Sequence, residues 1–306
     1  MKIPGGGAGP VRLGLASSRP LPTAYLEHAR LILGQAATNI TFRSLRAPFP
    51  AATFVGELTG EITEAWLAEL ISPATAVGID AALTTGQLAE QGPQLIVTDV
   101  DSTFITGEGL DLIAEKAGVS EGVSAITERA MAGELDFAAS LRERLSLIEG
   151  ADARLIDAAR AEIRPSPGAL RLVRLAHDRG VKIGLVSGGF HEVLDELVTH
   201  WGVDYLAANR MEIAGGKLTG KPSGPIIDRA AKAHTVRRWA AELGVPHELV
   251  VCAGDGANDL DMLALAGLGI AYNAKPTVRE QADAAITCGR LDAIATMFGW
   301  EDTPEH

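Results

Sequence analysis

The stretch LIVTDVDST, residues 95–103, places two aspartates two positions apart at the end of an apolar run. Residues 95–97 are typical of a buried strand, and residues two apart in a strand point the same way. Asp99 and Asp101 would then share one side, where two carboxylates repel each other unless a cation or a shared proton holds them. Taken alone, the stretch could equally be a solvated turn whose aspartates cap the next helix.

Two further apolar runs also end in polar loops that contain glycine. SGGF (187–190) follows the run 181–186, and GDGAND (254–259) follows the run 248–253. Either loop alone is often a structural turn. In a doubly wound parallel sheet, however, ligands bind beyond the carboxyl ends of the strands. Three such loops in one chain therefore favour a shared site over three independent turns.

The residue types in these loops fit phosphoryl transfer. Asp99 and Asp255, brought together by the fold, would supply oxygen ligands for Mg²⁺, which binds few carboxylates together with waters and substrate phosphate. A carboxylate can also attack phosphorus, which gives an aspartyl-phosphate and divides one difficult displacement into two steps. Asp101 would be placed to protonate the leaving oxygen and later to take a proton from water.

The remaining polar groups predict a phosphate-binding site. Ser187 and the backbone N–H groups of Gly188 and Gly189 would bind phosphoryl oxygens at the start of the following helix. Glycine lets that backbone approach a ligand closely. Lys232, on the predicted helix 229–244, is a candidate cation for the transferring group, although a lysine on such a helix is by itself more often solvated.

In this order, DVDST, SGGF, a helix-borne lysine and GDGANDLDM resemble the haloacid dehalogenase superfamily of phosphohydrolases, most closely its phosphoserine phosphatases, over residues 94–298. The resemblance implies that Asp99 is the nucleophile and Asp101 the general acid and base. It implies Mg²⁺ as the cofactor, bound by the side chains of Asp99 and Asp255 and by the backbone carbonyl of Asp101. It also implies that Ser187, Gly188 and Lys232 hold the phosphate and that Asn258 contacts it. Asp259 would support Lys232 or the metal.

A long helical stretch, residues 109–164, separates the first strand of this region from the rest. It is too long for a crossover connection and predicts an inserted cap. In the family this cap closes over the site and reads the leaving group. The resemblance assigns the substrate ammonium to Glu108 and its carboxylate to Arg144, with Met131 and Phe137 closing the pocket. Considered without the family, Glu108 and Arg144 would be ordinary surface charges, but an amino-acid phosphate does need one anion and one fork-shaped cation beyond its phosphate.

The predicted fold class is α/β: a doubly wound parallel sheet with an inserted helical cap, plus an N-terminal α+β domain of ferredoxin-like βαββαβ order. Residues 1–10 are expected to be disordered, 11–84 to form the N-terminal domain, 85–94 to be a linker and 95–300 to form the phosphatase domain. The N-terminal domain resembles ACT-type modules. Its first turn, ASSRPLP, lacks the glycine usual in such modules, which favours packing or homodimerisation over serine sensing.

Bulk properties exclude several classes of protein. The formal net charge of −12 argues against a nucleic-acid partner, whose phosphates would be repelled. The two cysteines, Cys252 and Cys288, form no CxxC pair and give no disulfide framework. No run resembles a signal peptide or approaches the length of a membrane span, so we expect a cytoplasmic protein without a membrane partner.

The function expected from these observations is Mg²⁺-dependent hydrolysis of O-phospho-L-serine to L-serine and phosphate, the last step of serine biosynthesis. The partner is then a small-molecule substrate. The alternatives are a phosphatase or phosphotransferase that acts on another small phosphorylated metabolite, and a regulatory binding module with a relic catalytic domain.

Overall fold

A seven-stranded sheet with the order β11-β10-β9-β5-β6-β7-β8 organises the larger part of the chain in the computed structural model. The structure describes residues 8–302, apart from the side chain of Met131. All neighbouring strands of this sheet are parallel except β7 and β8, which form an antiparallel hairpin at one edge. The strands are β5 (Leu95–Thr98), β6 (Lys182–Phe190), β7 (Tyr205–Ala214), β8 (Lys217–Ser223), β9 (Val250–Gly254), β10 (Leu268–Tyr272) and β11 (Ala284–Ile286).

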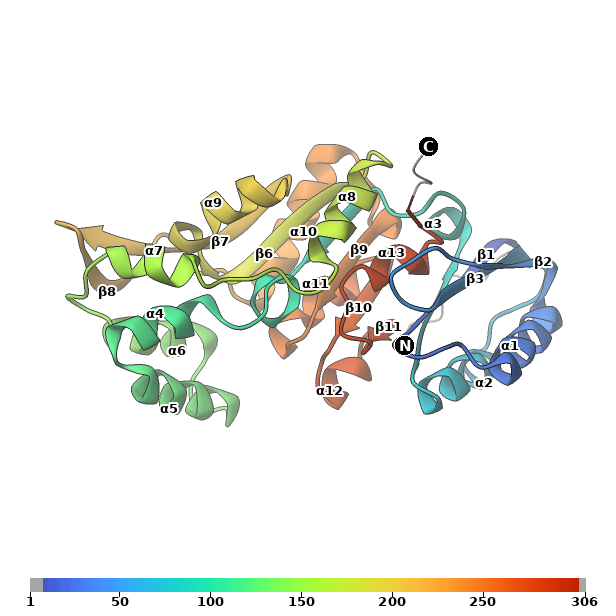
Figure 1. The fold of residues 1–306 in the computed structure, drawn as a ribbon, viewed down its shortest axis with the longest axis horizontal. Helices are drawn as coiled ribbons and strands as arrows, with labels where there is room; N and C mark the ends of the chain where they lie inside the picture. Colours follow the sequence, from blue (N-terminus) through green and yellow to red (C-terminus); the bar gives the residue numbers. More distant parts are fainter. Residues whose placement is uncertain (1–7, 303–306) are drawn as a thin grey trace.

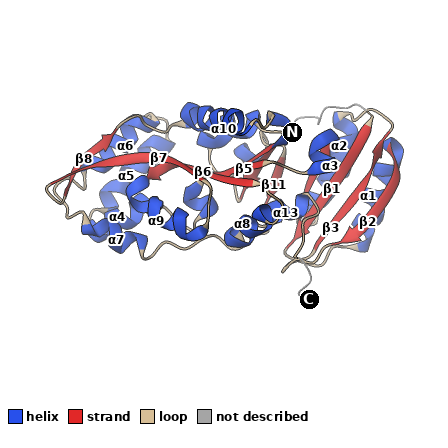
Figure 2. Cartoon of the chain, turned by 90° about the horizontal axis from the view of Figure 1, so that it is seen from above, coloured by secondary structure: helices blue, strands red, loops and turns tan. Residues whose placement is uncertain are grey.

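The central strand β5 is buried along its whole length, which explains why it reads as an uninterrupted apolar run. Its alternate residues face two separate cores. Ile96 packs with residues of the helices on one face of the sheet, whereas Leu95 and Val97 pack with helices on the other. Figure 2 shows these helices as two layers, with α10 on one side of the strands and α8 and α9 on the other. The prediction of a doubly wound parallel sheet is confirmed.

The helices around this sheet follow the strands in sequence. The first layer contains α8 (Ala169–His177), α9 (His191–Trp201) and α13 (Ala293–Met297), and the second contains α10 (Arg229–Leu243) and α11 (Leu260–Leu265), while the short α12 (Pro276–Arg279) precedes β11. Gly215 and Gly216, both with positive φ, form the turn of the β7–β8 hairpin, as the sequence predicts.

Four helices between β5 and β6 form the inserted cap: α4 (Gly109–Ala117), α5 (Ser120–Met131), α6 (Phe137–Ser146) and α7 (Arg154–Arg160). They lie at the end of the molecule opposite the N-terminal domain (Figure 1). The hairpin strand β8 fastens the cap, because Gly150 N–H donates to the Leu218 carbonyl at 2.8 Å and Leu218 N–H donates to the Ala151 carbonyl at 2.9 Å. The cap is thus bound to the same sheet that carries the polar loops.

The N-terminal domain is an antiparallel sheet of order β2-β3-β1-β4 with two helices, the ferredoxin-like arrangement expected from the sequence. Its elements are β1 (Gly9–Ser17), α1 (Thr23–Ala36), β2 (Ala37–Ser44), β3 (Ala51–Leu58), α2 (Glu64–Ala76) and β4 (Ile79–Thr85). The helices share one core with the sheet, in which the buried side chains of Leu13, Leu33 and Leu70 take part.

Two expected boundaries are wrong. Gly9 and Pro10 were expected to be disordered but begin β1, because they pair with the end of β3; residues 1–7 lie outside the described residues. The expected linker 85–94 contains the helix α3 (Gly86–Gln91), whose Leu88 and Ala89 are buried. Because this segment is mostly polar, its sequence predicted a linker, and the two apolar residues that anchor the helix were not recognised.

Close backbone packing joins the two domains. A side chain at Gly14 of β1 would lie 2.3 Å from the Met297 Cα of α13, so only glycine fits there. The buried carboxylate of Asp80 on β4 accepts hydrogen bonds from Thr287 N–H at 2.8 Å, from the Thr287 hydroxyl at 2.7 Å and from Cys288 N–H at 2.9 Å. These bonds hold the N-terminal sheet against the loop that follows β11.

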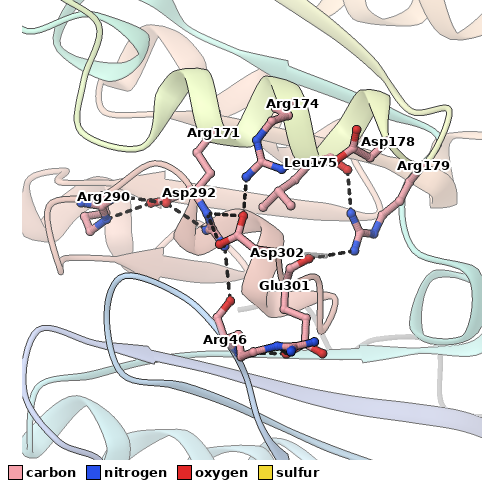
Figure 3. A network of polar contacts seen from close by, with 10 residues as sticks. All are labelled: Arg46, Arg171, Arg174, Leu175, Asp178, Arg179, Arg290, Asp292, Glu301 and Asp302. Carbon is pink, nitrogen blue, oxygen red and sulfur yellow. Dashed lines mark hydrogen bonds and ion pairs between the residues drawn. The ribbon is translucent and has the colours of Figure 1, made fainter. Parts of the chain in front are cut away.

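An ionic network closes the junction on the other side (Figure 3). Asp292, whose side chain is fully buried, accepts from Arg171 at 3.0 Å and from Arg290 at 3.0 Å. Arg171 also pairs with Asp302 at 2.9 Å. Next to it, the carboxylate of Glu301 accepts from the backbone N–H of Arg46 in the N-terminal domain at 2.9 Å. The last described residues therefore tie the N-terminal domain to α8. Within residues 8–302, no helix has both the length and the apolar character needed to cross a bilayer.

Candidate active site

The two aspartates of DVDST leave the central strand through an irregular turn, Val100–Phe104. Asp99 is extended, and its N–H donates to the Ala253 carbonyl of β9 at 2.8 Å. Ser102 adopts a left-handed backbone conformation with φ 57°, which is unusual for a residue other than glycine. Asp99 and Asp101 precede this turn, both have extended backbone conformations, and both line the same cavity.

Asp101 is held by groups from the cap and from the second polar loop. One carboxylate oxygen accepts from Gly109 N–H at the start of α4 at 2.8 Å, and the other accepts from the Ser187 hydroxyl at 3.1 Å. Burial raises the pKa of Asp101, against the opposing effect of these hydrogen bonds. A raised pKa favours the protonated carboxyl that a general acid needs.

Lys232 is a fully buried ammonium between two carboxylates. Its Nζ lies 2.7 Å from Asp99 Oδ1 and 2.7 Å from Asp259 Oδ1. Burial alone would lower the pKa of Lys232, but Asp259 and Asp99 raise it above its ordinary value. For Asp99, burial and the charge of Asp259 raise the pKa, and Lys232 opposes them. The two carboxylates therefore favour the charged form of Lys232, and that charge partly offsets the repulsion among the carboxylates.

Three carboxylates have the donor chemistry of a divalent-cation site. Ligand atoms of Asp99, Asp255 and Asp259 all lie within 4.8 Å of one another. The carboxylate of Asp255 is positioned by the Thr103 hydroxyl, which donates to it at 3.1 Å. Both oxygens of Asp259 are bonded, Oδ1 to Lys232 and Oδ2 to Gly256 N–H at 3.0 Å, whereas within the described residues Asp99 bonds Lys232 through Oδ1 alone. Asp99 and Asp255 are therefore the better placed ligands. Hard carboxylate oxygens of this kind suit Mg²⁺.

The loop Ser187-Gly188-Gly189 lies beside the aspartates. The Ser187 hydroxyl is fully buried and accepts from Gly189 N–H at 2.7 Å. A side chain at Gly189 would lie 3.0 Å from Asp101 Oδ2, and one at Gly188 would lie 2.8 Å from the ring of Phe137. A side chain at either position would therefore force a neighbour to shift, Asp101 or Ser187 beside Gly189 and the cap residue Phe137 beside Gly188.

A cavity of about 110 Å³ connects these loops with the cap. Its lining comes from the three strand-end loops and from α4 and α6: Asp99, Asp101, Glu108, Leu110, Phe137, Leu141, Arg144, Gly188, Gly189, Phe190, Asp255 and Asn258. The Nε of Arg144 is buried, with no hydrogen-bond partner among the described residues. Burial, followed by the charges of Asp101 and Asp111, raises the pKa of Glu108 to about 7, against the opposing charge of Arg144.

The structure brings together nearly all the residues singled out in the sequence. Nine of them line the cavity, and Ser187, Lys232 and Asp259 lie directly behind it through the contacts above. The side chain of Met131 lies outside the described residues. No role for Thr103, Leu110, Leu141 or Phe190 was predicted from the sequence. Thr103 belongs to the DVDST motif, so its place in that motif was the signal available.

A parallel sheet with paired aspartates beyond its central strand, a lysine-bonded carboxylate from a neighbouring loop and an inserted cap is the design of a haloacid dehalogenase-like hydrolase. The chain belongs to this family, whose model matches residues 96–264. The match does not include the N-terminal domain, whose likeness to ACT modules stays a prediction. The prediction that the chain belongs to this superfamily is confirmed.

Within the family, several of the similar proteins are phosphoserine phosphatases. The chain is 45% identical to the phosphoserine phosphatase of Streptomyces coelicolor over 258 residues, which cover 84% of this chain and 62% of the relative. It is 48% identical to that of Streptococcus thermophilus, over 63% of this chain and 90% of the relative. The crystal structure of a hydrolase of this family from Salmonella enterica serovar Typhi superposes with a TM-score of 0.82 at 28% identity, covering 94% of this chain and 99% of the other. The chain thus spans less than two thirds of the Streptomyces protein.

Proposed function

We propose that this chain is a Mg²⁺-dependent phosphatase that hydrolyses O-phospho-L-serine to L-serine and phosphate through an aspartyl-phosphate. The observation that carries the proposal is the shared cavity. It joins the aspartates of phosphoryl transfer to one carboxylate, Glu108, and one incompletely bonded guanidinium, Arg144. A buried guanidinium nitrogen without a partner is costly unless a ligand satisfies it, and a carboxylate is the anion that fits its fork. The similarity to phosphoserine phosphatases supports the same substrate.

In the first step, the carboxylate of Asp99 attacks phosphorus, and the bond from phosphorus to the serine oxygen breaks. Asp101 gives its proton to that oxygen, so that serine leaves neutral at its hydroxyl. Lys232 holds Asp99 in place and stabilises the negative charge of the transferring group. In the second step, Asp101 takes a proton from water, the water oxygen attacks phosphorus, and the bond to Asp99 breaks.

The side chains of Asp99 and Asp255, with the backbone carbonyl of Asp101, would hold the metal ion. A bound Mg²⁺ neutralises phosphate charge and removes the repulsion between carboxylates. Ser187 and the backbone N–H of Gly188, with Asn258, would bind the phosphoryl oxygens. The Gly189 N–H, which donates to the Ser187 hydroxyl in the structure, would join them by releasing that hydroxyl. Glu108 would bind the substrate ammonium, Arg144 would bind the carboxylate, and Phe137, together with Met131, would exclude water from the closed site.

The test is phosphate release from four esters, with Mg²⁺ and with a chelator. Phosphoserine carries both recognition groups, phosphoethanolamine lacks the carboxylate, phosphoglycolate lacks the amine, and p-nitrophenyl phosphate lacks both. We expect turnover that needs the metal and strongly prefers phosphoserine. Equal turnover of all four esters would support phosphoryl transfer by the aspartates but refute phosphoserine as the specific substrate. No turnover in the presence of metal would refute the proposal that the chain is a phosphatase.

If the substrate is phosphoserine, the reaction would complete serine synthesis, and we propose that the protein acts in the cytoplasm. We also propose a homodimer formed through the N-terminal domain. Its edge strand β2 is largely exposed and includes Phe42, whose exposed fraction is 41%. Sedimentation at micromolar concentration tests this, since a monomer would reject it.

A further inference from the structure

The phosphate-binding loop interrupts the pairing of two strands. Val186 pairs with Ala207, and the next pair is Phe190 with Asn209, so three residues of β6, from Ser187 to Gly189, lie opposite the single residue Ala208 of β7. Such a bulge removes backbone groups from the ladder, and they need other partners when buried. The Gly188 carbonyl is one of these groups.

Asn209 satisfies that carbonyl from the neighbouring strand. Its side chain is 1% exposed, and Nδ2 donates to the Gly188 carbonyl at 2.8 Å. At the other end, Oδ1 accepts from Ile227 N–H at 2.7 Å. The orientation of the amide follows from its partners, since only Nδ2 can donate and only Oδ1 can accept.

The first of these bonds fixes the peptide between Gly188 and Gly189. A trans peptide points its carbonyl and its N–H in opposite directions. Here the carbonyl is held by Asn209, and the Gly189 N–H donates to the Ser187 hydroxyl at 2.7 Å, which in turn donates to Asp101. Because both flanking residues are glycines, side-chain sterics do little to prevent this peptide from rotating.

The second bond reaches the segment that positions Lys232. Ile227 directly precedes Asp228, the N-cap of α10, whose side chain accepts from Ala231 N–H at 2.9 Å. The Lys232 N–H then donates to the Asp228 carbonyl at 2.9 Å, in the first turn of the helix. The start of α10 therefore determines where the ammonium meets Asp99.

From these contacts we infer that Asn209 is a positioning residue for phosphate binding, one amide that sets both the orientation of the Gly188–Gly189 peptide and the start of the Lys232 helix. It touches neither the nucleophile nor the leaving group. The inference rests on the proposed phosphatase activity. It predicts that replacing Asn209 weakens binding of the phosphate group and leaves recognition of the amino-acid part of the substrate unchanged.

The variants are Asn209→Asp and Asn209→Ala. The aspartate variant keeps the volume and can accept from Ile227, but as a carboxylate it cannot donate to Gly188; the alanine variant loses both bonds. The matched control is Glu192→Ala. The Glu192 carboxylate accepts from Met211 N–H at 3.0 Å, so it binds the same strand two residues further along without touching the phosphate loop. Thermal unfolding of each variant measures how much stability the substitution costs.

The measurement is calorimetric binding of inorganic phosphate in the presence of Mg²⁺, with turnover of p-nitrophenyl phosphate and phosphoserine measured beside it. We expect both Asn209 variants to bind phosphate about tenfold or more weakly and to lose about the same factor in kcat/KM on both esters, because misplacing a binding group by about 1 Å can cost a hundredfold. The Glu192 variant should bind phosphate as the wild type does.

Phosphate binding by Asn209→Asp equal to that of the wild type, or an equal loss in Glu192→Ala of similar stability, would overturn the inference while leaving the proposed function intact. Should Asn209→Ala fail to fold, Asn209→Asp decides alone. A wild-type protein that neither binds phosphate nor releases it from any ester would overturn the proposed function and the inference with it.

Discussion

Replacing Lys232 by Met removes the positive charge that the structure places between Asp99 and Asp259. Nζ lies 2.7 Å from each carboxylate, and the ammonium is 1% exposed. Removing one partner of a buried ion pair costs about 3–5 kcal/mol, because the remaining charge stays buried without compensation. We expect a free energy of unfolding lower by about that amount at pH 7, and a loss in kcat of about a hundredfold to several-thousandfold if the same interaction acts in the transition state.

The double variant Lys232→Met, Asp259→Asn separates the two effects. It removes one of the two carboxylates left unpaired, so it should regain much of the lost stability but none of the lost turnover. Urea unfolding and phosphate release are the assays. Arg229→Ala on the same helix is the control, since Arg229 forms an exposed ion pair with Asp261 and should change stability by less than about 1 kcal/mol. Recovery of activity in the double variant, or equal stability of Lys232→Met and wild type, would refute this reasoning.

Further predictions concern the nucleophile, the ammonium site and the domain junction. Asp99→Asn should abolish turnover with Mg²⁺ present while thermal unfolding shows an intact fold, since it keeps the shape and removes the attacking oxygen. Because the pKa of Glu108 is raised to about 7, the ionised form that binds an ammonium is lost as the pH falls below 7; the KM for phosphoserine should rise there more than that for p-nitrophenyl phosphate, and Glu108→Gln should remove the difference. Asp292→Asn should lower the free energy of unfolding by about 2 kcal/mol in urea titration without altering kcat, because it weakens the buried bonds to Arg171 and Arg290 far from the cavity.

Much of the site could be predicted from the sequence because it is built from local signals. Asp99 and Asp255 each directly follow a buried strand, and Ser187 lies near the end of β6; parallel strands bring their carboxyl ends to one edge. The glycines and aspartates at these strand ends further restrict the reactions that the site could carry out. The order of strands and helices predicted the sheet for the same reason.

What the sequence did not predict depends on contacts between distant residues. Thr103 and Asp255 are separated by 152 positions, and nothing in either segment alone indicates their hydrogen bond. The unpartnered Nε of Arg144 is visible only once the cap is packed on the sheet. Helix α3 forms because burial of Leu88 and Ala89 outweighs a local composition typical of a linker.

The most direct test of the central claim compares kcat/KM for phosphoserine and for p-nitrophenyl phosphate in the wild type and in Arg144→Ala. If one cavity combines phosphoryl transfer at Asp99 with recognition of an amino acid by the cap, the variant should lose about a hundredfold or more on phosphoserine, which is the cost of a charged hydrogen-bonded pair, and little on the aryl ester. Equal losses on both substrates would contradict the assignment of Arg144 to the substrate carboxylate, and with it the proposed substrate.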